Sequence, residues 1–243
     1  MKIIAVFKWS RNPQDARVGT NGSLDWRGVK MAPNEDDPAV MEVANAIVAE
    51  GEIVGLTIGD GDIAWAAARG AARTIVVNDA QTEADSSVIA AVIAAAIKRV
   101  EGVDAVIIGD SDWDYGVVSA LMGKLGWSAV AGVVSATKEQ GGLRVTRKIG
   151  AASQVLEVEG PVVLAAAANR EEKNVPGMKE ILAARKKPVE RLTMADLGLA
   201  PAADVLSKGT RFPDTPPARM IDGTDPVAAC KELMVALRSE GVL

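Results

Sequence analysis

The sequence predicts an α/β fold, with a mostly parallel sheet and helices on both of its faces. Three observations lead to this prediction. Short runs rich in Val and Ile alternate with longer helical patterns along the first half of the chain. Hydrophobic residues make up 49% of the chain and aromatic residues only 3%, a balance typical of Ala-rich helices packed on a β-branched sheet. The length of 243 residues suits one large domain with an appendage.

The alternation of strands and helices runs from the N-terminus to about residue 125. We expect strands at Ile3–Phe7, Ile53–Ile58, Thr74–Val77 and Val103–Ile108. We expect helices at Pro38–Glu50, Ile63–Ala71, Ala84–Val100 and Gly116–Leu125. This βαβα order predicts a Rossmann-like sheet, and open sheets of this kind bind ligands at the carboxyl ends of their strands.

The pattern changes after Ser128. Short strand-like runs separated by turn signals predict an antiparallel hairpin added to the sheet, then one more buried strand and a helix. These elements are expected at Val130–Ala136, Leu143–Ile149, Val155–Val158, Pro161–Ala168 and Gly177–Lys186. Pro and Gly become frequent beyond Pro188, and a helical pattern returns only at Asp225–Ser239. We therefore expect an α/β domain at 1–188 and an extended C-terminal arm at 189–243 that lies on another surface.

Composition argues against several classes of function. The net charge of −5 gives no reason to expect binding to DNA, RNA or an anionic membrane. No apolar stretch reaches the roughly 18 residues of a membrane span, and the segment Met1–Trp9 lacks the features of a signal peptide. We therefore expect a soluble, cytoplasmic protein with no nucleic-acid partner and no stable membrane insertion.

The chain contains no histidine and a single cysteine. Histidine is the commonest general base, the usual partner of a nucleophilic Ser or Cys, and a frequent metal ligand. Its absence argues against a conventional hydrolytic or metal-dependent enzyme. Cys230 cannot form an internal disulfide, and a lone thiol in a helical pattern is expected to be a small core residue.

The segment most informative about a ligand follows the fourth expected strand. The strand runs into Gly109, a polar loop follows, and a helix begins at Gly116. Backbone N–H groups and the positive end of the helix dipole would then face the loop, which is a common way to bind phosphate. The pattern fits equally well an ordinary turn in which Asp114 caps the helix. Asp110, Asp112 and Asp114 could instead hold a divalent cation, but solvated turn positions explain at least two of them more simply.

Two further loops have a similar character. Residues 57–62 contain glycines that allow close backbone approach, and residues 33–38 place acids and Pro38 at the start of a helix. Neither loop is a G-x-G-x-x-G or Walker A motif. Helix capping alone would explain the second loop. Three such loops at one edge of the sheet would nevertheless form a pocket for an adenine nucleotide.

A basic cluster ends the last helix of the expected domain. It consists of Arg185, Lys186 and Lys187, and Met178 precedes it in what reads as a loop. Cations favour the C-terminus of a helix, so a solvated helix end is the simplest interpretation of the cluster. An exposed apolar residue such as Met178 is also typical of an anchor that docks onto another protein.

The order of several segments is characteristic of one protein family. These segments are Ile4–Lys8 (IAVFK); Asn34, Glu42 and Ala44; Ala67–Ala71 (AARGA); Gly109–Val118; Leu143–Arg147 (LRVTR); Gly160–Val163; and Ala183–Pro188 (AARKKP). Together they resemble the beta subunit of electron transfer flavoproteins, and the resemblance covers nearly the whole chain.

The resemblance implies that the chain is half of a heterodimer that relays electrons and transforms no substrate itself. An electron transfer flavoprotein alpha subunit would carry most of the redox-active FAD, and this chain would bind AMP or a second FAD. By position, the nucleotide-binding residues would be Val6, Asn34, Asp37, Ile58, Gly109, Ser111, Asp112, Asp114, Gly116, Val117 and Val118. Met178, with Arg185 and Lys186, would dock onto a flavin dehydrogenase such as an acyl-CoA dehydrogenase. The arm at 189–243 would embrace the alpha subunit.

Two other classes of protein share this architecture. An adenine-nucleotide-binding regulator of the universal-stress type would carry a glycine-spaced phosphate motif after a late strand, and the sequence has none. This class is the alternative function. A nucleotide-alpha-hydrolase-like ligase would carry a Ser-Gly-Gly-x-Asp-Ser loop after the first strand, where Lys8–Arg11 stands instead. An electron carrier needs no proton-transfer residue, which fits a chain without histidine.

Overall fold

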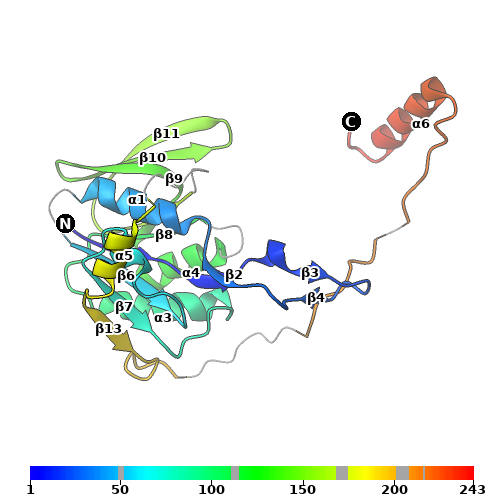
Figure 1. Cartoon of the computed structure of the whole chain (residues 1–243). Helices are drawn as coiled ribbons and strands as arrows, with labels where there is room; N and C mark the ends of the chain where they lie inside the picture. The colour runs from blue at the N-terminus through cyan, green and yellow to red at the C-terminus, as the bar shows by residue number, and fades with distance from the viewer. Residues whose placement is uncertain (49–51, 111–114, 168–174, 201–207, 216) are drawn as a thin grey trace. The chain divides into compact units, whose positions relative to one another are not determined.

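The computed structural model describes all residues of the chain except 49–51, 111–114, 168–174, 201–207 and 216 (Figure 1). Contacts divide the chain into two compact units. The first unit comprises Met1–Arg17 and Asp25–Lys208, and the second comprises Val18–Leu24 and Gly209–Leu243. None of the helices in the described part of the chain is both long and apolar enough to cross a membrane.

A nine-stranded sheet forms the centre of the first unit, in the order β11-β10-β9-β12-β8-β1-β6-β7-β13. Its strands are β1 (Lys2–Val6), β6 (Glu52–Ile58), β7 (Arg73–Val77), β8 (Ala105–Gly109), β9 (Ser128–Glu139), β10 (Gly142–Ile149), β11 (Ala152–Val158), β12 (Val162–Ala166) and β13 (Val189–Leu192). Neighbours from β9 to β13 in this order pair in parallel, whereas β9, β10 and β11 pair antiparallel. This topology confirms the predicted mostly parallel sheet and its added hairpin.

Helices cover both faces of the sheet, as predicted (Figure 1). The helices of the first unit are α1 (Asp37–Ile47), α2 (Trp65–Ala68), α3 (Ser86–Lys98), α4 (Tyr115–Leu125) and α5 (Met178–Ala184). In β1, Ile3 and Ala5 belong to the core formed with α1, while Ile4 and Val6 belong to the core formed with α3 and α4. Successive side chains of a strand point to opposite faces, so a sheet covered on both sides requires uninterrupted apolar strands.

The sequence pattern gives no sign of β13. Its residues pair in parallel with β7, and the Thr74 N–H donates to the Pro188 carbonyl oxygen at 3.0 Å. Two of its four residues are charged and only Leu192 is buried, because an edge strand needs a backbone partner rather than two apolar faces. The segment predicted as an arm therefore begins with an edge strand of the sheet. The domain division after residue 188 stays a prediction.

Helix α2 is shorter than the predicted helix at Ile63–Ala71. Gly70 adopts a φ of +121°, a value that other residues rarely reach, and so ends the helix. The Asn45 side chain lies against Gly70 and donates through Nδ2 to the Arg69 carbonyl oxygen at 2.8 Å. The helix end is thus fixed by a contact with α1 that the local sequence does not reveal.

Several short elements lie outside the main sheet. Two pairs of strands precede α1: β2 (Trp9–Arg11) with β5 (Met31–Pro33), and β3 (Arg17–Val18) with β4 (Leu24–Asp25). A short 3₁₀ helix, η1, occupies Pro13–Asp15. None of these was predicted, because strands of two or three residues are too short to show an alternation of polar and apolar side chains.

The second unit contains α6 (Pro226–Ser239), which confirms the helix predicted at Asp225–Ser239. Asp225 caps it by accepting hydrogen bonds from the N–H groups of Val227 and Ala228. No residue of α6 is buried, and Cys230 is exposed. The expectation that Cys230 is a core residue is wrong, because α6 buries no face within its own unit.

Candidate functional site

The candidate site lies at the carboxyl ends of β1 and β8. These two strands are neighbours, but the next strand of the sheet after β1 is β6, on one side, and the next after β8 is β9, which lies beyond β12 on the other side. Such a reversal of strand order leaves a crevice between the two diverging connections, where open α/β sheets bind their ligands. The topology therefore selects one position on the sheet edge before any side chain is considered.

A cavity of about 30 Å³ occupies this position. Five of the residues that the family resemblance implied for the nucleotide line it: Val6, Asn34, Asp37, Gly109 and Val117. They come from the end of β1, the start of α1, the end of β8 and the first turn of α4. Residues far apart in the sequence therefore meet at one point. The volume is close to that of a single water molecule, so the cavity has room for only the innermost polar group of a ligand.

The remaining predicted nucleotide residues lie around this cavity or outside the described chain. Ile58 ends β6 and is buried, but does not line the cavity. Gly116 and Val118 lie in the first turn of α4, and Val118 is buried in the core. Ser111, Asp112 and Asp114 lie outside the described residues.

Asp37 joins β1 to α1. Its Oδ2 accepts hydrogen bonds from the backbone N–H of Asn34 at 2.9 Å and of Lys8 at 3.1 Å. It is the first residue of α1, where the helix dipole favours an acid, and Pro38 follows it at a position suited to the first turn. The end of the first strand and the start of the first helix are thus held by one carboxyl group.

Burial raises the pKa of Asp37 from 3.8 to about 8. The hydrogen bonds from Lys8 and Asn34 and the positive charge of Lys8 act in the opposite direction, while neighbouring Asp36 raises the pKa further. Desolvation is the largest of these effects, since the carboxyl group is removed from water. Asp37 is therefore mostly protonated at neutral pH and places little negative charge at the site.

Asn34 contributes a buried acceptor with no hydrogen-bond partner. The residue is 6% exposed, and its Oδ1 makes no hydrogen bond within the described structure. A buried polar atom without a partner costs about 1–3 kcal/mol. Because Asn34 lines the cavity, a water molecule or a donor group of a ligand can supply the missing hydrogen bond.

The two glycines predicted at the site are required by close packing. A Cβ on Gly109 would lie 2.9 Å from the Asp36 Cβ, and a Cβ on Gly116 would lie 2.8 Å from the Ser86 Oγ. Gly109 thus lets the end of β8 approach the residues that precede α1, and Gly116 lets α4 approach α3. Both contacts bring the elements around the cavity together.

The first acid of the predicted polar loop has a structural role. Asp110 Oδ2 accepts a hydrogen bond from the Gly132 N–H at 2.6 Å, which ties the end of β8 to β9. The described residues contain no group of three or more His, Cys, Asp or Glu that could hold a metal ion. Asp112 and Asp114 lie outside the described residues, so the cation alternative stays untested.

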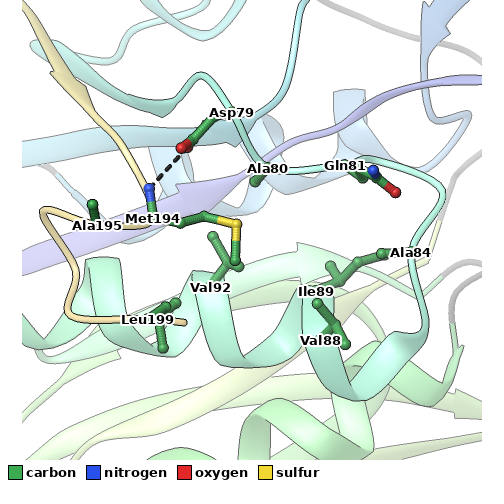
Figure 2. Close-up of a pocket in the computed structure, with 10 residues that line it drawn as sticks. All are labelled: Asp79, Ala80, Gln81, Ala84, Val88, Ile89, Val92, Met194, Ala195 and Leu199. Atoms are coloured by element: carbon green, nitrogen blue, oxygen red, sulfur yellow. Dashed lines mark hydrogen bonds between the residues drawn. The ribbon is translucent and has the colours of Figure 1, made fainter. Parts of the chain in front are cut away.

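A second, larger cavity of about 420 Å³ lies beside the same sheet edge (Figure 2). Its walls are the loop after β7, with Asp79 and Ala84, the first turns of α3, and the turn after β13, with Met194. The lining is mostly apolar, and Asp79 Oδ1 accepts a hydrogen bond from the Met194 N–H at 2.8 Å. In Figure 2 the Met194 side chain extends towards Val92 of α3. No sequence pattern predicted this cavity, because one of its walls is the turn after the unpredicted strand β13.

The two cavities share one wall. Ile89 of α3 lines both, and Lys8, which lines the smaller cavity, donates through Nζ to the Thr82 carbonyl oxygen at 3.1 Å. The loop after β7 is thereby held against the end of β1.

The predicted docking residues lie on and beside α5. Met178 is the first residue of this helix rather than part of a loop, and it is 72% exposed. Arg185 and Lys186 are exposed at the helix end. Lys187 has a structural role, since its Nζ donates to the carbonyl oxygens of Ala67 at 2.9 Å and Ala71 at 2.7 Å.

The protonated Asp37 predicts a distinctive pH dependence of stability. The folded state holds the proton up to about pH 8, whereas the unfolded chain releases it near its usual pKa of 3.8. The folded state therefore binds more protons in this window, and the contribution of Asp37 to the free energy of unfolding falls as pH rises through it. Asp37→Asn keeps an oxygen acceptor and removes the titration. Denaturant unfolding at about pH 5 and about pH 8 should show a weaker pH dependence in this variant.

Asp60→Asn, at an exposed position, is the matched control and should keep the pH dependence of the original chain. An unchanged pH dependence in Asp37→Asn would contradict the assignment of a raised pKa to this carboxyl group.

Comparison with protein families supports the family seen in the sequence, without distinguishing its beta subunit from its alpha subunit. The model described as the electron transfer flavoprotein domain matches residues 24–197, which is more than half of the chain. The match includes α1, β6 to β12 and α5, and so covers most of the sheet and most of the residues around the smaller cavity. The chain belongs to the electron transfer flavoprotein domain family, whose members are electron carriers.

Proposed function

We propose that this chain is the beta subunit of a heterodimeric electron transfer flavoprotein. It relays electrons from a flavin dehydrogenase to a downstream acceptor, through FAD held mainly by the alpha subunit, and binds AMP or a second FAD itself. The observation that carries the proposal is the meeting of five implied nucleotide residues at one cavity, at the reversal of strand order. The chain performs no substrate chemistry of its own.

The groups around the cavity suit an adenine nucleotide. Asn34 Oδ1 has no hydrogen-bond partner within the described chain. It can therefore accept a hydrogen bond from the exocyclic amine of an adenine. Protonation of Asp37 removes a charge that would repel a phosphate nearby. The start of α4 at Tyr115 and Gly116 directs the positive end of a helix dipole towards the same sheet edge.

The residues around the cavity indicate which roles belong to the flavin and which to the chain. A bound flavin supplies the redox chemistry, and the chain supplies binding and orientation. The hydrogen bonds of Asp37 and the close packing at Gly109 join β1, β8 and α1 at the sheet edge and hold these elements in position. Rigid positioning without proton transfer is what an electron carrier needs from a chain that contains no histidine.

The surface of α5 supports docking onto an electron donor. Met178 and Leu182 of α5 are exposed apolar residues four positions apart, a spacing that places side chains on one side of a helix, and the exposed Val175 lies in the segment before α5. Arg185 and Lys186 add positive charge at the end of the same helix. An apolar anchor beside cations suits a partner with a hydrophobic pocket and an acidic rim.

Coexpression with an electron transfer flavoprotein alpha subunit tests the proposed function. Purification through a tag on this chain should recover a heterodimer, and acid release should yield one FAD with one AMP, or two FAD, per heterodimer.

Asn34→Leu removes the acceptor while keeping the side-chain volume similar. We expect it to lower the nucleotide retained by this chain by about tenfold, because the donor of the ligand loses its partner. The chain itself should remain at least as stable, because an unpaired buried oxygen is lost.

Asn78→Leu, at an exposed strand end, is the control and should retain the nucleotide. If this chain is purified without a partner subunit and without flavin, the electron-carrier function is refuted and the universal-stress type of regulator is favoured. A normal nucleotide content in Asn34→Leu would refute only the role of Asn34 in binding the nucleotide, and would leave the electron-carrier function standing.

Met178→Glu tests the docking surface. A charge at an apolar anchor should raise the KM of the donor dehydrogenase for the purified heterodimer by about tenfold or more. FAD content and heterodimer formation should stay unchanged. Ile149→Glu, at an exposed apolar position of the hairpin, is the matched control and should leave the KM as it was. Equal KM values for both variants would contradict docking through α5.

A further inference from the structure

The second unit brings together two segments that are far apart in the sequence. One is the turn between β3 and β4, residues 19–23, and the other is residues 209–212 of the C-terminal arm. The turn is closed by hydrogen bonds from Gly19 N–H to the Ser23 carbonyl at 2.8 Å and from Gly22 N–H to the Gly19 carbonyl at 2.9 Å. The Asn21 side chain accepts a further bond from the Ser23 N–H at 3.1 Å. The turn therefore has a defined shape of its own.

The arm packs directly on this turn. The Thr210 Oγ1 accepts a hydrogen bond from the Leu24 N–H at 2.9 Å, across 186 positions of sequence. The peptide bond between Arg211 and Phe212 lies against Gly22. A Cβ on Gly22 would overlap the Phe212 nitrogen and lie 2.6 Å from the Arg211 carbonyl carbon. These neighbours are backbone atoms, so a side chain at position 22 could not be accommodated by a change of rotamer.

We propose that the turn at residues 19–23 is an intramolecular docking site for the arm, with Gly22 receiving the Arg211–Phe212 peptide bond. Two independent features support it. The φ of Gly22 is +78°, which other residues rarely adopt, and the arm backbone fills the space that a Cβ would need. The hydroxyl of Thr210 supplies the acceptor for the adjacent Leu24 N–H. Loss of either contact should release the arm.

This docking has a consequence for assembly that rests on the proposed function. The arm leads to α6, which has no buried residue and exposes Val227, Leu233 and Val235. An ion pair of 2.8 Å between Arg219 and Glu232 already joins the arm to α6. Holding the arm at residues 210–212 reduces the conformational entropy that α6 loses when it meets the alpha subunit.

Limited trypsin digestion of the full chain tests the docking without a partner or a nucleotide. Trypsin can cut after Arg211, at the peptide bond that rests on Gly22, and after Arg219, an exposed site further along the arm. The second cut is the internal reference. In the original chain the first cut should be slow relative to the second, because a protease needs a locally released segment. Gly22→Val should raise the ratio of the first rate to the second by about tenfold or more.

Gly28→Val is the matched control, because Gly28 also has a positive φ, of +83°, but no atom lies within 4 Å of its Cβ position. It should leave the ratio of cleavage rates unchanged. Thr210→Val removes only the hydroxyl acceptor and should raise the ratio by a few-fold. This second variant keeps the test valid if Gly22→Val does not fold. Equal cleavage at both sites in the original chain, or equal effects of Gly22→Val and Gly28→Val, would refute the docking. Neither result would bear on nucleotide binding or on electron transfer.

Discussion

The hydrogen bonds of the Asp37 carboxyl group are the constraint on which the site depends. One side chain accepts from the end of β1 and from the residues that precede α1, at the point where the strand order reverses. Burying the group is unfavourable for its charged form, and the resulting rise in pKa keeps it neutral at the site. The hydrogen bonds therefore fix the geometry of the sheet edge, while burial keeps the carboxyl group neutral and without a charge that would repel a phosphate.

Much of the fold could be predicted from sequence because β-strand and helix periodicities differ. The runs around Ile4, Ile75 and Ile107 are buried on both faces, so they read as continuous apolar strands flanked by amphipathic helices. The elements that escaped prediction lack such a pattern. Strand β13 is half charged, and its pairing with β7 depends on a contact between residues more than a hundred positions apart. The end of α2 likewise depends on Asn45, which belongs to another helix.

The candidate site divides in the same way. Gly109 was named from the strand–loop–helix pattern and Val6 from the family resemblance, and parallel strands bring both residues to one edge of the sheet. The unpaired oxygen of Asn34 and the raised pKa of Asp37 could not be found, because both depend on burial by distant segments. The larger cavity, which shares Ile89 with the smaller one, was not predicted because one of its walls is the turn after β13, and β13 itself was not predicted. Exposure was equally hard to foresee, as Cys230 shows.

A structure of the purified complex with its bound nucleotides would test the central claim most directly. We predict a nucleotide at the carboxyl ends of β1 and β8, with a donor group within hydrogen-bond distance of Asn34 Oδ1 and its phosphate near the start of α4. A nucleotide bound to this chain at another edge of the sheet, or in the larger cavity beside Met194, with only water beside Asn34, would contradict the account.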